Sequence, residues 1–290
     1  MANFPRRRVK NGVASAPKVA RFSKFARQPA GEASGKKSLR RRGIYLLPNA
    51  FTTAALFCGF YAIIMAMDQK FEHAAWAIFI AMILDGLDGR IARLTNTQSE
   101  FGAQYDSLSD MVSFGAAPAL VIYEWSLRGL GRYGWLAAFV YCAGGALRLA
   151  RFNTNIEVVD KRFFQGLPSP AAAAIVAGYI LLMDDLKVSG VQWPWVSWSI
   201  TLFAGLTMVT NVPYYSFKDV NFRKSVPFIV VFLIALAFAL VSIDPPKVLF
   251  PIFILFGFSG YAVYFWRLAK GKPVSIVQTN REPVDQSERH

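Results

Sequence analysis

Four aspartates stand at spacings that place their side chains on two helical faces. Asp85 and Asp88 are three residues apart, Asp106 and Asp110 are four apart, and Gly102 lies one further turn upstream. Residues three or four apart share one face of an α-helix, so each pair forms a short acidic stripe. We expect the two stripes to face each other and to bring the four carboxylates together.

Carboxylates gathered in this way repel one another and need a positive partner. Oxygen ligands without histidine or cysteine favour Mg²⁺ or Mn²⁺, and carboxylates shared between two such ions commonly clamp a phosphoryl group. Gly89 and Gly102 would leave room for a ligand beside the helix backbone. The structural alternative is that the aspartates form ion pairs with Arg90 and Arg93 at a membrane surface.

The segments that carry these residues have the composition of membrane helices. The 290-residue chain is 54% hydrophobic and 17% charged, whereas soluble domains carry about 25% charged residues. A bilayer-spanning helix needs about 20 mostly apolar residues. The stretches that qualify lie near residues 46–67, 73–94, 103–127, 133–152, 169–185, 193–215, 226–243 and 247–267. We expect an all-α, polytopic membrane bundle of about eight transmembrane helices, with the second and third polar at the end that carries the aspartates.

The distribution of basic residues predicts the orientation of this bundle. Thirteen of the 32 Lys and Arg residues precede position 44, and five lie in the connections on the opposite side, at Lys70, Arg128, Arg132, Lys187 and Lys247. By the positive-inside rule, both termini and the polar helix ends are cytoplasmic. We expect an integral protein of a bacterial inner (plasma) membrane. Its basic arm either attracts anionic membrane lipids or only fixes the orientation, and nucleic acid is not expected as a partner.

The motif residues together resemble those of a known family, the CDP-alcohol phosphatidyltransferases. The match holds at every position and spacing of Asp85, Asp88, Gly89, Ala92, Arg93, Gly102, Asp106 and Asp110. It covers a core of six helices at about residues 44–224. Outside it we expect a disordered cytoplasmic arm, two additional transmembrane helices and a cytoplasmic tail, at residues 1–43, 225–270 and 271–290. The resemblance implies a homodimeric membrane enzyme that transfers a phosphatidyl group from a CDP-linked lipid to an alcohol and releases CMP.

The resemblance also assigns roles to the motif residues. The metal ligands would be the four aspartates, which would hold two Mg²⁺ or Mn²⁺ ions, and Asp110 would also take the proton from the acceptor hydroxyl. The nucleotide and diphosphate pocket would be lined by Asp88, Gly89, Arg93 and Gly102. Arginine offers a planar fork that suits phosphate oxygens.

Further polar residues on the same predicted side are candidates for substrate contacts. Asn49 and Thr52 lie one turn apart, where they would reach the nucleotide, although a helix cap explains Asn49 equally well. Arg148 and Arg151 would bind the acceptor or a lipid phosphate, or else would anchor their helix at the head groups. Lys218 allows the same two interpretations.

Three segments resemble family members that use serine as the acceptor: residues 48–60, 148–153 and 165–170. We therefore expect phosphatidyl transfer from CDP-diacylglycerol to L-serine, by metal-assisted in-line attack of the serine hydroxyl. Another acceptor, such as glycerol 3-phosphate, choline or an inositol compound, is the alternative within the family. A cation- or proton-coupled transporter is the alternative from another class, and it predicts carboxylates near the membrane centre with access from both faces.

Overall fold

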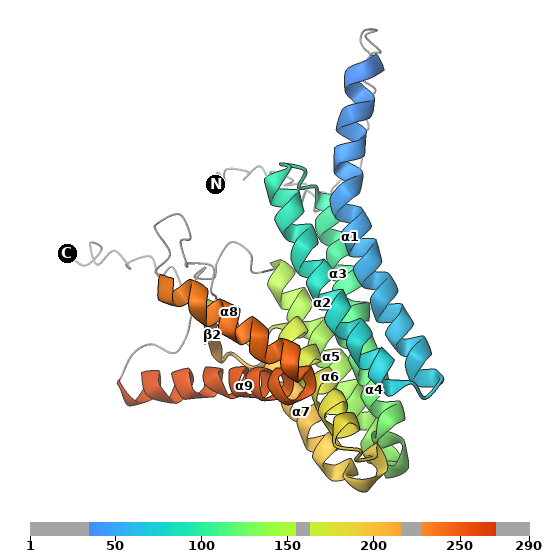
Figure 1. The fold of residues 1–290 in the computed structure, drawn as a ribbon, viewed down its shortest axis with the longest axis vertical. Helices are drawn as coiled ribbons and strands as arrows, with labels where there is room; N and C mark the ends of the chain where they lie inside the picture. Colours follow the sequence, from blue (N-terminus) through green and yellow to red (C-terminus); the bar gives the residue numbers. More distant parts are fainter. Residues whose placement is uncertain (1–34, 155–162, 216–227, 271–290) are drawn as a thin grey trace, which may run out of the picture.

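A computed structural model describes residues 35–154, 163–215 and 228–270 of the chain. These residues form a bundle of helices joined mostly by short turns (Figure 1). The helices are α1 (Gly35–Met67), α2 (Phe71–Leu94), α3 (Glu100–Asp110), η1 (Met111–Ala116), α4 (Ala117–Trp125), η2 (Leu127–Leu130), α5 (Arg132–Thr154), α6 (Ser169–Asp185), η3 (Gly190–Gln192), α7 (Pro194–Val209), α8 (Phe228–Ile243) and α9 (Pro245–Ala269).

Each of the eight predicted stretches coincides with helical structure, but two differ from the expectation. The stretch near 103–127 is divided, because a π-helical segment, η1, separates α3 from α4. The stretch near 193–215 ends as a helix at Val209, and Pro213–Tyr215 instead forms strand β2. This strand pairs antiparallel with β1 (Phe163–Gln165). The described residues are otherwise mostly helical, as an all-α fold predicts. Pro213 lacks the N–H that would continue a helix.

The first helix begins earlier than its apolar residues suggested. Helix α1 starts at Gly35, inside the segment expected to form the basic arm. Residues 1–34 and the C-terminal residues 271–290 lie outside the described part of the chain.

The centre of the bundle is helix α6. Its residues from Ala171 to Leu181 are all buried, and it packs against α2, α4, α7 and α9. Six of its side chains are alanine or glycine within this run, and small side chains let neighbouring helices approach closely. In Figure 1, α1 and α2 stand along the long axis of the molecule, while α8 and α9 lie across it. The motif region is therefore carried on α1, α2, α3 and the end of α5.

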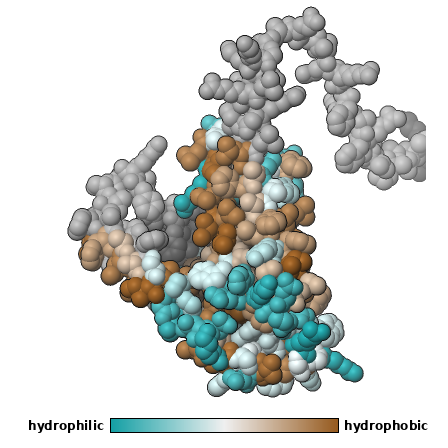
Figure 2. Space-filling model, turned by 45° about the vertical axis from the view of Figure 1, so that its right-hand side comes forward, coloured by the Kyte–Doolittle hydropathy of each residue, from teal (hydrophilic) through white to brown (hydrophobic). Residues whose placement is uncertain are grey.

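The helices differ in their ability to cross a membrane. By length and hydropathy, Leu47–Met67 and Pro245–Ala269 qualify among the described residues. Helices α6, α7 and α8 have 17, 16 and 16 residues, fewer than the roughly 20 that a span requires. Figure 2 shows hydrophobic residues over much of the upper flank of one face and hydrophilic residues gathered toward its lower end. The presence of eight transmembrane helices stays a prediction.

Candidate active site

The acidic stripes of α2 and α3 face each other, as their spacing predicts. Each of Asp85, Asp88 and Asp106 offers a carboxylate oxygen, and these oxygens lie within 4.8 Å of one another. Asp110, one turn beyond Asp106, interacts with Asp85 through its side chain. We call these four residues the acidic cluster. Among the described residues, no ion pair joins the cluster to Arg90 or Arg93, so the ion-pair alternative for the aspartates is not supported.

The acidic cluster contains oxygen atoms that need a partner. Asp106 Oδ1 and Asp110 Oδ1 are buried and accept no hydrogen bond. A buried carboxylate oxygen without a donor costs free energy unless a cation or a proton compensates it. A hard divalent cation is the partner that an all-carboxylate donor set suits best. The residues present therefore fit a divalent metal site.

Helix α1 connects the two stripes through Thr52. The Thr52 hydroxyl donates to Asp88 Oδ2 at 2.7 Å and also lies 3.2 Å from the carbonyl oxygen of Pro48. The backbone carbonyl of Thr52 accepts a hydrogen bond from Ser109 Oγ at 3.1 Å. One residue of α1 thus contacts α2 with its side chain and α3 with its backbone. Its hydroxyl, which was expected to reach the nucleotide, is directed at a carboxylate of the cluster.

A cavity of about 410 Å³ opens beside the acidic cluster. Its walls contain all the residues predicted to bind the nucleotide and diphosphate, together with one further aspartate: Asn49, Thr52, Asp88, Gly89, Arg93, Gly102 and Asp106. A Cβ atom on Gly89 would have Arg93 Nη2 as its nearest neighbour, at 4.0 Å, so the helix surface here is open. A Cβ atom on Gly102 would lie 3.1 Å from Ser99 Oγ and 3.5 Å from Asn49 Oδ1. The two motif glycines therefore keep this side of the cavity clear.

The structure adds wall residues that the sequence reasoning missed. Thr97, Gln98 and Ser99 come from the turn between α2 and α3, and Phe152 comes from the end of α5. Ser99 is the N-cap of α3, and its hydroxyl accepts a hydrogen bond from the Gly102 backbone at 3.0 Å. Serine is one of the preferred residues at a helix N-cap, so Ser99 just before a predicted helix is a recognisable cap signal. Phe152 belongs to the segment 148–153 singled out above, but no role had been assigned to its side chain.

The predicted cationic residues do not share one environment. The Arg148 guanidinium donates to Ser169 Oγ at 2.6 Å and interacts electrostatically with Asp85 and Asp110. Arg151 instead donates to Asn211 Oδ1 at 3.1 Å and to the Thr210 carbonyl oxygen at 3.4 Å. Arg148 thus lies within electrostatic reach of the acidic cluster, whereas the polar contacts of Arg151 are with the segment after α7. Lys218 lies outside the described residues.

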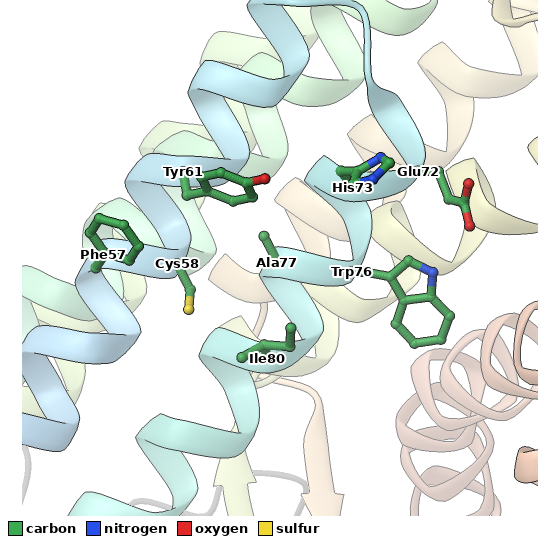
Figure 3. A pocket seen from close by; sticks show the side chains of 8 residues that line it. All are labelled: Phe57, Cys58, Tyr61, Glu72, His73, Trp76, Ala77 and Ile80. Carbon is green, nitrogen blue, oxygen red and sulfur yellow. The ribbon is translucent and has the colours of Figure 1, made fainter.

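A second cavity, of about 330 Å³, lies between α1 and α2 nearer their connecting turn. Figure 3 shows Phe57 and Tyr61 on α1 opposite Ala77 and Ile80 on α2. The lining is mainly apolar, and it contains no residue of the acidic cluster. This cavity is separate from the candidate active site.

Known proteins resemble the chain over the region that carries the site. The family model for CDP-alcohol phosphatidyltransferase matches residues 45–212. A Helicobacter pylori protein named CDP-diacylglycerol–serine O-phosphatidyltransferase is 38% identical over 195 residues, which cover 67% of this chain and 82% of the relative. Relatives with the same name from Mycobacterium leprae and Methanocaldococcus jannaschii are 30% and 34% identical over 73% and 57% of this chain, and each match covers 72% of the relative. The chain belongs to the CDP-alcohol phosphatidyltransferase family.

Proposed function

We propose that this protein transfers the phosphatidyl group of CDP-diacylglycerol to L-serine, giving phosphatidylserine and CMP. The observation that carries the proposal is the acidic cluster beside an open cavity, in a chain whose family transfers such groups. Relatives that align with this chain over most of their own length carry names that give serine as the acceptor. These relatives favour serine over the other acceptor alcohols and favour an enzyme over a transporter.

The acidic cluster would hold Mg²⁺ or Mn²⁺, with two ions per site. Asp85, Asp88 and Asp106 would be ligands, and Asp110 would complete the set through its buried oxygen. Bound divalent ions neutralise charge on a diphosphate and on the group being transferred. Thr52 would orient Asp88 through its hydrogen bond, in the way that residues around a metal site fix its ligands.

The chain's own residues supply the remaining steps of the reaction. Asn49, Gly89 and Gly102 line space for the nucleotide and diphosphate, and Arg93 would donate to phosphate oxygens. The serine hydroxyl oxygen forms a bond to the phosphorus that carries diacylglycerol, while the bond from that phosphorus to the CMP oxygen breaks. Asp110 accepts the hydroxyl proton.

The acceptor would be held by cations near the acidic cluster. Arg148 is the better placed candidate, because it lies within electrostatic reach of Asp85 and Asp110. Arg151 and Lys218 are proposed as further contacts for the serine carboxylate or a lipid phosphate. An ionised carboxylate pairs strongly with arginine, since the planar fork allows two parallel hydrogen bonds.

The setting proposed for this reaction is a bacterial plasma membrane. Residues 44–224 would form the six-helix catalytic core, α8 and α9 would add two spans, and both termini and the active site would face the cytoplasm. The protein would function as a homodimer among membrane lipids. The excess of basic residues on the predicted inner side supports this orientation.

An acceptor panel tests the proposal. Purified protein would receive CDP-diacylglycerol, Mg²⁺ or Mn²⁺, and one acceptor at a time: L-serine, glycerol 3-phosphate, choline or an inositol compound. We expect CMP release and a new phospholipid with serine alone, and their loss in Asp110→Asn. Release with another acceptor and none with serine would overturn the serine assignment but leave the family reaction in place.

A further inference from the structure

The helix that carries Asp106 and Asp110 changes its winding immediately after Asp110. Helix α3 ends at Asp110, and η1 continues as a π-helix before α4 resumes the α-helical form. The wider turn is visible in the hydrogen bond from the Ala117 N–H to the carbonyl oxygen of Val112, five residues back. Such segments are uncommon and often occur at functional sites.

The sequence provides a physical cause for the π-helix. In an α-helix the carbonyl oxygen of Phe114 would accept from residue 118, but Pro118 has no N–H and its ring crowds that carbonyl group. Tyr141 of α5 compensates, because its hydroxyl donates to the Phe114 carbonyl oxygen at 3.1 Å. Tyr141 and Phe114 are both fully buried, so this hydrogen bond has no competition from bulk solvent.

A second contact fixes η1 against α1. Ser113 Oγ donates to the carbonyl oxygen of Ala55 at 3.1 Å, and Ser109 makes the equivalent bond to Thr52 one turn earlier. Gly59 permits this approach, since a Cβ atom there would lie 2.7 Å from Ser113 Cα. The segment that follows Asp110 is thus bonded to α1 through Ser113 and to α5 through Tyr141.

We infer that the bonds that tie η1 to α1 and α5 hold Asp110 in its place in the acidic cluster, and that Tyr141 and Ser113 are positioning residues for the proposed phosphatidyl transfer. Ser109 and Ser113, four residues apart on one helical face, both donate to α1, and Asp110 lies between them in the chain. The backbone that follows Asp110 is therefore fixed by the bond of Ser113 to α1 and by the bond of Tyr141 to Phe114. This inference rests on the proposed function, because it assigns Asp110 a part in the reaction.

The test compares two tyrosines that make the same kind of buried hydrogen bond. Tyr141→Phe removes the donor to Phe114, and Tyr214→Phe is the matched control, since Tyr214 is buried and its hydroxyl donates to the Gly257 carbonyl oxygen at 2.6 Å. Ser113→Ala is the second variant and removes less of the packing. Each variant would be assayed for Mn²⁺ affinity, from the electron paramagnetic resonance signal of free Mn²⁺. With serine as the acceptor, it would also be assayed for kcat and for the KM for CDP-diacylglycerol.

Misplacing a reacting group by about 1 Å costs on the order of 100-fold in rate, and losing a residue that orients a metal ligand costs about 10–100-fold in metal affinity or activity. We expect Tyr141→Phe and Ser113→Ala to lower kcat by roughly tenfold or more, with KM for CDP-diacylglycerol little changed. Mn²⁺ affinity should fall in both variants and stay at the wild-type value in Tyr214→Phe.

Three outcomes decide the inference. Wild-type kcat and Mn²⁺ affinity in both Tyr141→Phe and Ser113→Ala would overturn it. Equal losses in Tyr214→Phe would also overturn it, because they would show a general effect of losing a buried tyrosine hydroxyl. If the wild-type protein binds Mn²⁺ but does not use serine, the proposed function fails, and the Mn²⁺ affinities of the variants still decide whether η1 positions Asp110.

Discussion

At the scale of single residues, Thr52 has the most specific role in the acidic cluster. Its hydroxyl donates to Asp88 at 2.7 Å, and Asp88 lies within 4.8 Å of two other carboxylates. Thr52→Val keeps the shape and removes the donor, so we expect Mn²⁺ affinity and activity to fall about 10–100-fold. Calorimetric titration with Mn²⁺ measures the first quantity.

A buried threonine far from the cluster supplies the control for this experiment. Thr201 lies on α7, and its hydroxyl donates to the Ser197 carbonyl oxygen of the same helix. Thr201→Val should therefore keep the wild-type affinity. Wild-type Mn²⁺ affinity and activity in Thr52→Val would show that Asp88 needs no support from α1.

Gly89 allows stability and activity to be separated. Alanine at this helical position meets no atom closer than 4.0 Å, so Gly89→Ala should fold and raise stability by about 0.5–1 kcal/mol. The added methyl group projects into the cavity, where it would crowd the bound substrate. A crowding cost of about 1–3 kcal/mol corresponds to roughly a fivefold to 150-fold loss of kcat/KM. Thermal unfolding and CMP release measure the two effects.

Gly86 offers a matched control on the same helix. A methyl group added there would also meet open space, but Gly86 does not line the cavity. Gly86→Ala should gain similar stability and keep its activity. Equal activity in the two variants would mean that the substrate does not approach α2 at Gly89.

At the scale of elements, close contact between α5 and α7 holds the helix that carries Arg148. A Cβ atom on Gly144 would overlap the carbonyl oxygen of Gly205 on α7. Gly144→Ala should therefore separate the helices and lower the free energy of unfolding by about 1–3 kcal/mol. Thermal denaturation in detergent measures this change. Gly129→Ala is the control, because its methyl group would have no atom within 4 Å, and its unfolding midpoint should stay unchanged. A wild-type midpoint in Gly144→Ala would show that the two helices can adjust freely.

The sequence predicted the helices more completely than it predicted their irregular parts. Helix α6 was predicted at 169–185 and spans Ser169–Asp185, because apolar runs bounded by Pro168 and polar residues define such an element locally. The π-helix after Asp110 could not be predicted in this way. It depends on Pro118 together with the hydroxyl of Tyr141, which lies on a helix distant in the sequence. Only tertiary packing brings these residues together.

The same distinction applies to the candidate site. Helical spacing predicted two acidic stripes, and the expectation that they face each other is confirmed for Asp85, Asp88 and Asp106. Arg148 and Arg151 were predicted as one pair of substrate contacts, yet Arg148 interacts with Asp85 and Asp110 while Arg151 donates to Asn211 after α7. A substrate-contact role for either arginine stays a prediction. Residues that come from another element, such as Phe152 in the cavity wall, have no local pattern from which to predict them.

At the scale of the whole molecule, the proposed orientation places the acidic cluster and the α2–α3 turn in the cytoplasm. Glu100, beside this turn, and Lys187, in the turn after α6, are both exposed. Single cysteines at these positions should react differently with an impermeant maleimide added to intact spheroplasts. We expect labelling of Lys187→Cys from outside and labelling of Glu100→Cys only after permeabilisation, with the unmodified protein as the control for Cys58 and Cys142. Labelling of Glu100→Cys in intact spheroplasts would reverse the orientation.

The location of bound metal tests the account most directly, because every proposed role in the reaction depends on the acidic cluster. Anomalous diffraction from crystals grown with Mn²⁺ and CDP-diacylglycerol would reveal the ions. The account predicts manganese between the carboxylates of Asp85, Asp88 and Asp106, within reach of Asp110 and beside the lipid diphosphate. Manganese bound elsewhere, with this cluster free of metal while serine-dependent CMP release continues, would contradict it.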